Sequence, residues 1–154
     1  KSASTKWNFN NYHPGLVGGH CVPVDPYYLI DEAKKFSANL PLIAQARKTN
    51  EEAVINFCRK ILNKLKCPYA SSYVLIHGLS FKPDVPDIRN TQVPSLKSML
   101  EQNGVKVDIY DPNVRPEVAK NSFGIELLKK LPAFDNYHLI VSPYDLSIKR
   151  GGRF

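Results

Sequence analysis

Cys21 is the side chain of this sequence that is best suited to covalent chemistry. It follows Gly18 and Gly19 closely, and the pair Asp25-Pro26 just after it has the residue types of a helix start. Glycines allow backbone N–H groups to approach a ligand, and a nearby helix N-terminus favours the thiolate form of a cysteine. Such a thiolate can act as a nucleophile. The alternative, a small buried apolar residue, stays open on these grounds.

The neighbouring polar residues have weaker claims to a chemical role. Asp25 is equally consistent with a helix N-cap and with a catalytic or orienting carboxylate. His20 directly precedes the cysteine, and adjacent side chains rarely form a catalytic pair. His77 interrupts an apolar run, where a histidine is more often a core residue than a ligand. For the two other cysteines, Cys58 and Cys67, we predict structural roles only.

A second group of charged residues follows the first apolar run of the chain. The segment "FKPDVPDIRN" carries Lys82 and Arg89, with Asp84 and Asp87 between them. Two cations at the end of a strand can hold an anionic ligand. The segment is equally consistent with a solvated loop whose surface ion pairs contribute little. The sequence contains no glycine-rich dinucleotide fingerprint, no P-loop and no His, Cys or Asp set with metal-ligand spacing, so we expect no metal.

The elements that position these residues follow from the hydrophobic pattern. Apolar residues at helical spacing, with helix-start residues, predict a first helix over 26–37 and an unusually long one over 41–66. Continuous apolar runs predict buried strands over 72–79, 105–112 and 137–143. Between the strands, we expect helices over 90–104, ending at Gly104, and over 116–121.

This order predicts an α/β fold in which a long central helix precedes a Rossmann-like parallel sheet. Strand, helix, strand with short connections is typical of parallel sheets with right-handed crossovers. Ligands of such sheets bind beyond the carboxyl ends of the strands. In this sequence, the three predicted ends carry "GLSFKPD", "DPNV" and "SPYD".

Composition narrows the class of protein and of partner. The 154 residues are 43% hydrophobic and 23% charged, which is ordinary for a soluble domain with its own core. The net charge of +7 comes from scattered Lys and Arg, which favours a small anion over nucleic acid. No apolar stretch is long enough for a membrane span, and the polar first ten residues predict no signal peptide. Three cysteines without a CxxC pair fit a reducing cytoplasm.

Three motifs in this sequence resemble those of the UDP-glucose/GDP-mannose dehydrogenase family, the nucleotide-sugar 6-dehydrogenases. "PGLVGGHCVPVDPYYL" is similar to the family's active-site signature, and its His and VDPYYL ending resemble the UDP-N-acetylhexosamine branch. "ARKTNEEAV" resembles a stretch of the family's long central helix. "GLSFKPDVPDIRNTQVPSLKSMLEQNGVKVDIYDP" resembles the start of its C-terminal nucleotide-sugar-binding domain.

The resemblance implies a role for each matching residue. It makes Cys21 the catalytic nucleophile and Asp25 the carboxylate that assists it. It assigns Lys82 to the substrate side of the cleft and Arg89 to the cofactor, which is NAD in this family. The signature glycines are implied to line the sugar and phosphates of the substrate: Gly15, Gly18 and Gly19.

The resemblance also implies an activity and an organisation. The implied enzyme oxidises the C6 alcohol of a UDP-N-acetylhexosamine to a uronic acid through a Cys thioester, for polysaccharide biosynthesis. We expect an active-site loop and central dimerisation helices over 1–66, and a UDP-sugar-binding α/β domain over 67–154. The family's N-terminal NAD-binding Rossmann domain is missing from this sequence, as are the Lys and Asn that support its cysteine. The sequence therefore predicts the C-terminal part of a longer enzyme.

Three further points concern the oligomeric state, an alternative function and the end of the sequence. The apolar stripe of the long helix, which includes Leu42, Ala46 and Ala53, is wide enough to predict packing against a second copy, hence a homodimer. A nucleotide-sugar-binding and dimerisation module without turnover is the alternative function. The ending "IKRGGRF" does not resemble the last strand of the family's third domain.

Overall fold

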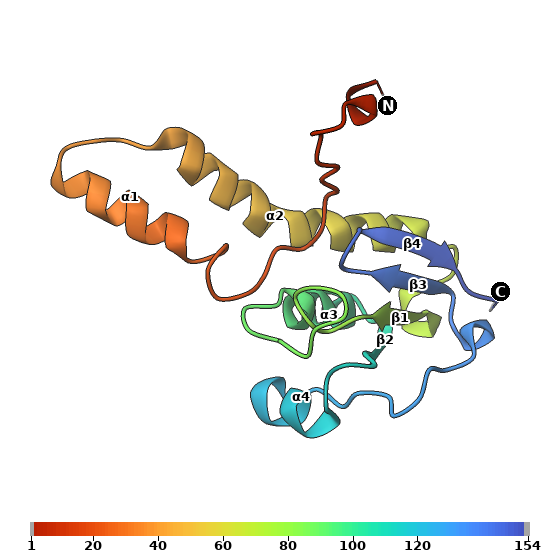
Figure 1. Ribbon diagram of the computed structural model, residues 1–154. Helices are drawn as coiled ribbons and strands as arrows, with labels where there is room; N and C mark the ends of the chain where they lie inside the picture. The colour runs from red at the N-terminus through yellow and green to blue at the C-terminus, as the bar shows by residue number, and fades with distance from the viewer. Residues whose placement is uncertain (1, 153–154) are drawn as a thin grey trace.

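The computed structural model describes residues 2–152, which form a helical hairpin set on a small α/β sheet (Figure 1). The hairpin consists of α1 (Asp25–Lys35) and α2 (Pro41–Lys64). The sheet region contains β1 (Tyr73–His77), β2 (Lys106–Tyr110), β3 (Leu139–Ser142) and β4 (Ser147–Arg150). Its helices are α3 (Val93–Gln102) and α4 (Pro116–Phe123). Short 3₁₀ turns cover Ala3–Thr5, Tyr69–Ser71 and Phe134–Asn136.

The sheet has the strand order β2-β1-β3-β4, and its first three strands are parallel. β1 lies at the centre, where it pairs with β2 from Tyr73 to His77 and with β3 from Val74 to Ile76. A strand with neighbours on both sides and layers on both faces must bury its side chains. Accordingly, Val74, Leu75 and Ile76 are fully buried. The prediction of an α/β fold with a Rossmann-like parallel sheet is confirmed.

β4 is the one strand that the sequence analysis did not predict. It runs antiparallel to β3, with Leu139 opposite Arg150 and Ser142 opposite Ser147. Its sequence, Ser-Ile-Lys-Arg, is only partly buried and ends in two exposed cations. Charged residues are common on edge strands, where they discourage pairing with another chain. The short polar ending therefore forms a strand, although it lacks the apolar run by which the others were predicted.

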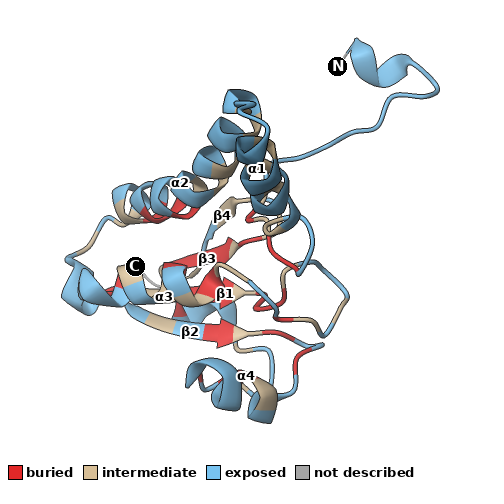
Figure 2. Ribbon diagram, turned by 90° about the vertical axis from the view of Figure 1, so that its left-hand side faces the viewer, coloured by how far each residue is buried: buried red, intermediate tan, exposed pale blue. Residues whose placement is uncertain are grey.

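The long helix α2 has two environments along its length (Figure 2). Its buried residues, Val54, Phe57, Cys58 and Ile61, all lie in the second half, where they join the core between the helix and the sheet. In the first half, Leu42 is 82% exposed, and α1 packs alongside. The predicted length is nearly right, since the helix ends at Lys64 instead of 66. Ala53, which we placed on a dimer stripe, packs partly buried against the chain's own core.

The remaining helices lie close to their predicted positions. α3 ends before Gly104, which has the left-handed φ of 88° expected of a helix-terminating glycine. The N–H of Gly104 donates a hydrogen bond to the Glu101 carbonyl at 2.8 Å. α4 is two residues longer than predicted and also ends at a left-handed glycine, Gly124. Among residues 2–152, no helix combines the length and the apolar character needed to cross a membrane.

The anchoring of α2 to the sheet can be tested at two isoleucines of the same helix. Ile61 is fully buried, whereas Ile55 is 40% exposed. Ile61→Ala should lower the free energy of unfolding by about 3 kcal/mol, because it removes buried apolar surface and leaves a cavity. The matched change Ile55→Ala should cost less than about 1 kcal/mol. Urea unfolding followed by circular dichroism measures both, and equal losses would contradict this packing.

Candidate functional site

The glycine-rich loop lies against the carboxyl ends of the parallel strands. The Leu16 N–H donates to the Pro143 carbonyl, just after β3, at 2.9 Å, and the Gly19 N–H donates to the Arg89 carbonyl at 2.9 Å. In return, the Asn90 side-chain amide donates to the Gly19 carbonyl at 3.1 Å. A further amide, that of Gln92, donates to the Val17 carbonyl at 3.1 Å. Backbone groups and side-chain amides thus hold the loop in place, together with Leu16, which is buried in the core.

Two glycines of this loop are required by close packing. A Cβ on Gly15 would lie 2.3 Å from the Tyr144 carbonyl oxygen. A Cβ on Gly18 would lie 2.6 Å from the Phe81 Cβ. Neither neighbour is the flexible end of a side chain, so any larger residue would displace the loop. Close approach to the protein itself therefore requires glycine at positions 15 and 18, and the substrate contact that the resemblance implies for Gly15 and Gly18 stays a prediction.

Cys21 is exposed, as a nucleophile must be, and lies in the turn that leads into α1. Its carbonyl oxygen accepts hydrogen bonds from the backbone N–H groups of Val24 and Asp25, at 2.9 and 2.8 Å. These bonds begin the helix one residue earlier than predicted, so Val24 is the N-cap and Asp25 is the first helical residue. The Asp25 side chain does not accept the backbone N–H hydrogen bond that we expected of an N-cap residue. Asp25 is exposed, on the same turn as the thiol.

Arg89 lies on the sheet side of this turn. Its guanidinium donates to both carboxylate oxygens of Asp87, with Nε at 3.0 Å from each. These hydrogen bonds lower the pKa of the Asp87 carboxyl to about 2 and raise the pKa of Arg89. The charge of Cys21 makes a further, smaller contribution to the raised pKa of Arg89, and the charge of His20 makes one to the lowered pKa of Asp87. The two predicted segments therefore meet here.

Lys82 extends from the loop that follows β1. Its carbonyl oxygen accepts a hydrogen bond from the Ser80 hydroxyl at 2.9 Å, which fixes the backbone at this point. Its side chain is exposed and forms no ion pair within residues 2–152. Lys82 is therefore a cation that is free to meet an anionic ligand at the carboxyl edge of the sheet.

A buried carboxylate, Asp111, joins the strand ends beneath this surface. Its Oδ2 accepts hydrogen bonds from the N–H groups of Leu79 and Ser80 at 2.7 and 3.0 Å, and from the Tyr144 hydroxyl at 3.2 Å. Its Oδ1 accepts a hydrogen bond from the backbone N–H of Asn113 at 2.9 Å. Burial raises the pKa of this carboxyl, but the hydrogen bonds outweigh it and hold the pKa below its ordinary value.

The sequence analysis did not assign a role to Asp111, Ser80 or Tyr144. All three lie in the strand ends that the sequence marked as "GLSFKPD", "DPNV" and "SPYD". Their position at the carboxyl ends was therefore available from the sequence, and their contact with one another was not.

The two other cysteines have the surroundings of structural residues. Cys58 is buried, which raises the pKa of its thiol, and the Cys67 Sγ lies 3.1 Å from the Ser72 hydroxyl.

The Asp111 network gives a prediction about stability and pH. Asp111→Asn should lower the free energy of unfolding at neutral pH by about 2–4 kcal/mol, because the amide cannot accept all of these hydrogen bonds. The lowered pKa means that the carboxylate stabilises the fold above its ordinary pKa, and that this stability is lost as the pH falls through the lowered value.

Urea unfolding at a series of pH values measures both effects. The Asn variant should lack the part of the acid dependence that Asp111 provides, so the two stability curves should converge as the pH falls. Parallel curves, or a variant as stable as the parent at neutral pH, would contradict this role for the carboxylate.

Two family models match this chain. Residues 75–145 match the UDP binding domain of the UDP-glucose/GDP-mannose dehydrogenase family, and residues 1–52 match the central domain of the same family. These two ranges contain Lys82 and Arg89 in the first case, and the glycine loop with Cys21 in the second.

Individual relatives agree with the family models. The chain is 39% identical over 128 residues to a UDP-N-acetyl-D-glucosamine 6-dehydrogenase of Pseudomonas aeruginosa, covering 81% of this chain and 30% of that protein. It is 32% identical over 140 residues to a UDP-N-acetyl-D-mannosamine dehydrogenase of Methanococcus aeolicus, covering 84% of this chain and 31% of that protein. The chain thus spans less than a third of the length of these relatives.

A solved structure has the same fold. The UDP-D-ManNAc dehydrogenase of Pyrococcus horikoshii superposes with a TM-score of 0.76 at 26% identity, covering 94% of this chain and 32% of that one.

Proposed function

This chain belongs to the UDP-glucose/GDP-mannose dehydrogenase family, and on that premise we propose that it supplies the nucleophile and the UDP-sugar-binding surface of a nucleotide-sugar 6-dehydrogenase. The observation that carries the proposal is the docking of the glycine loop on the carboxyl edge of the sheet. This docking holds the exposed Cys21 beside Arg89, within a fold whose ligands bind at that edge.

The proposed substrate is a UDP-N-acetylhexosamine. Its support is the match to the UDP binding domain, together with relatives named as dehydrogenases of UDP-N-acetyl-D-glucosamine and UDP-N-acetyl-D-mannosamine. In this proposal, Lys82 attracts the diphosphate of the substrate, since its charge is not taken by an acid among the described residues. Gly19, whose N–H and carbonyl both bond to the sheet region, holds the loop at this edge beside the proposed substrate.

Cys21 forms the covalent intermediate in this proposal. Its sulfur adds to the C6 aldehyde of the partly oxidised sugar, so that an S–C bond forms and the aldehyde oxygen takes a proton. After oxidation at C6, the adduct is a thioester, which water cleaves to release the carboxylate and restore the thiol. The Asp25 carboxylate, exposed on the same turn, orients the water and accepts its proton. The product is a nucleotide-linked uronic acid of the kind used in polysaccharide biosynthesis.

NAD is the oxidant that we propose for the complete enzyme, where it would supply the hydride acceptor for the oxidations at C6. Residues 2–152 do not form a dinucleotide cradle. The sequence has no glycine-rich fingerprint after a strand, and Gly15 and Gly18 are packed against Tyr144 and Phe81. Arg89 is the residue that we propose contacts NAD, from the edge of the site. The main dinucleotide contacts then come from sequence beyond these 154 residues.

A second candidate function follows from the same fact. Without a dinucleotide cradle, the 154-residue chain by itself fits a module that binds the nucleotide sugar without turnover.

A cytoplasmic location is part of either proposal, because an exposed Cys21 requires a reducing compartment to remain a thiol.

The covalent role of Cys21 is testable in the complete enzyme. Cys21→Ser should abolish formation of the uronic acid, because a hydroxyl is a far poorer nucleophile than a thiolate. The matched change Cys58→Ser should leave the reaction intact and cost about 1 kcal/mol of stability through packing. Coupled measurement of NADH and acid provides the readout. Acid formation by the serine variant at the parent rate would rule out the thioester.

The binding role can be tested in the 154-residue chain by calorimetry. We expect UDP to bind and NAD to show no detectable heat, because the UDP-facing edge is present and the dinucleotide fingerprint is absent. Lys82→Gln should weaken UDP binding about tenfold through the loss of one charge-assisted contact. Lys34→Gln, an exposed change on α1, is the control. Tighter binding of NAD than of UDP would overturn this assignment.

We further propose that the chain forms a homodimer through the helical hairpin. α1, its C-cap residue Phe36 and the first half of α2 expose large apolar side chains that the sheet does not cover, among them Tyr28, Leu29 and Leu42. A second copy of the same surface would bury them with two-fold symmetry. Ala46, which is exposed on this part of α2, lies within the same surface.

Sedimentation of charged variants tests the dimer. Leu42→Glu and Ala46→Glu should convert it to a monomer that stays folded and still unfolds cooperatively in urea, because neither residue belongs to the core of the chain. Ser95→Glu, on the exposed face of α3, should leave the dimer intact. A parent chain that sediments as a monomer at tens of micromolar would contradict the dimer itself.

A further inference from the structure

A pocket rich in cations lies at the edge of the sheet opposite the candidate site. It has a volume of about 270 Å³ and lies between the end of α2, the segment that follows it, the start of β3 and the end of β4. Lys64, Lys66 and Arg150 line it, with Leu65 and Leu139 among the walls. We call this the basic pocket. A second hollow of about 330 Å³ continues from it and shares the same three cations.

The location follows from the strand directions. β1 and β3 are parallel, and their carboxyl ends lead to Gly78 and Pro143 at the candidate site. The basic pocket adjoins Leu139, the first residue of β3. β4 is antiparallel, so its last residue, Arg150, pairs with Leu139 at this same edge. The pocket is therefore separated from the candidate site by the length of the strands.

The charges of the basic pocket are not paired with an acid in the part of the chain that the structure describes. No carboxylate is among its lining residues. Five ion pairs are formed within residues 2–152, and they use the cations Lys35, Lys48, Arg89, Lys97 and Lys120. None of them involves a cation of the basic pocket. Three like charges around one hollow repel each other, and a bound anion would remove this repulsion.

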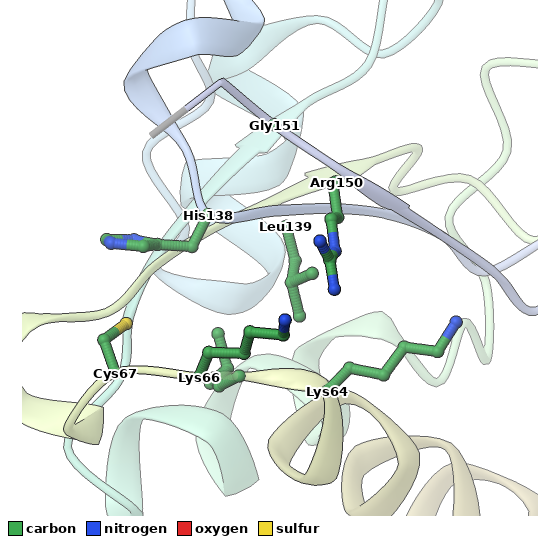
Figure 3. Close-up of a pocket in the computed structure, with 8 residues that line it drawn as sticks. Lys64, Lys66, Cys67, His138, Leu139, Arg150 and Gly151 are labelled. Atoms are coloured by element: carbon green, nitrogen blue, oxygen red, sulfur yellow. The ribbon is translucent and has the colours of Figure 1, made fainter. Parts of the chain in front are cut away.

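Helix electrostatics account for only part of the arrangement. Lys64 lies in the last turn of α2, where a cation offsets the negative end of the helix. Arg150 comes from an edge strand that is distant in sequence, and nothing about the helix end requires it there. In Figure 3, its guanidinium is turned toward Lys66, which lies in the segment that follows α2, while the side chain of Lys64 extends to the right from the end of α2. Two separate elements thus direct cations into one space.

We propose that the basic pocket binds the phosphate group of a small phosphorylated molecule. An arginine fork can hold two phosphate oxygens at once, and two lysines add mobile point charges. Leu65 and Leu139 offer an apolar wall for the body of the ligand. A hollow of about 270 Å³ fits a small molecule better than the backbone of a nucleic acid, which needs an extended basic groove. The inference stands independently of the proposed dehydrogenase activity.

The probe for this site is inorganic pyrophosphate, added to the ¹⁵N-labelled 154-residue chain. We expect saturable shifts of the backbone amides of Lys66, Leu139 and Gly151. The double variant Lys66→Gln/Arg150→Gln should weaken binding by about a hundredfold, since each lost charge-assisted contact is worth about tenfold. The control Lys34→Gln should leave binding within about twofold. Urea unfolding of each variant verifies that the fold is retained.

Two further measurements distinguish binding at the basic pocket from binding at the candidate site and from binding to a phospholipid surface. Lys82→Gln, at the candidate site, should leave the pyrophosphate shifts at the basic pocket unchanged. Vesicles of phosphatidylcholine with phosphatidic acid should not bind the chain through Lys66 and Arg150. The proposal is overturned if pyrophosphate shifts only the segment around Lys82, if the control loses as much affinity as the double variant, or if the vesicles bind through this pocket and pyrophosphate does not.

Discussion

The arrangement of the candidate site depends on one buried carboxylate, Asp111. This side chain is only 4% exposed, yet it accepts hydrogen bonds from the segments that follow β1 and β2 and from Tyr144 beyond β3. Without those donors, a buried carboxylate would be strongly destabilising. With them, it fixes the exits of three parallel strands relative to one another. Burial and the neighbouring carboxylate raise the pKa of Tyr144 to about 12, so its hydroxyl remains a donor.

The position of Cys21 follows from this junction through the glycine loop. Gly15 fits beside the Tyr144 carbonyl only because a glycine has no side chain. The Pro143 carbonyl accepts a hydrogen bond from the Leu16 N–H. The loop is therefore aligned on the same segment that Asp111 holds. A few backbone hydrogen bonds at one end of the sheet thus control where the thiol lies relative to Arg89.

The helix α2 connects the sheet region to an exposed apolar surface. Its second half is anchored in the core by Phe57 and Ile61, while its first half has only α1 beside it. The same helix can therefore serve the fold of the sheet region and present an apolar surface outside it. Its end, in turn, contributes Lys64 to the basic pocket, so three distinct surfaces share one element.

The sequence by itself determined the elements and the residue types at the site. Helical spacing and apolar runs gave the helices and the three parallel strands, because local periodicity decides which face of a segment can be buried. The turn with Cys21 and the loop with Lys82 and Arg89 were identified from their residue types. Only the tertiary structure decided that Asp111 meets Ser80 and Tyr144, that Gly18 packs on Phe81, and that Arg150 joins Lys64 across a pocket. These contacts join residues far apart in the chain, and no local pattern records them. β4 was missed for the same reason, since a short polar strand forms only where β3 offers it an edge.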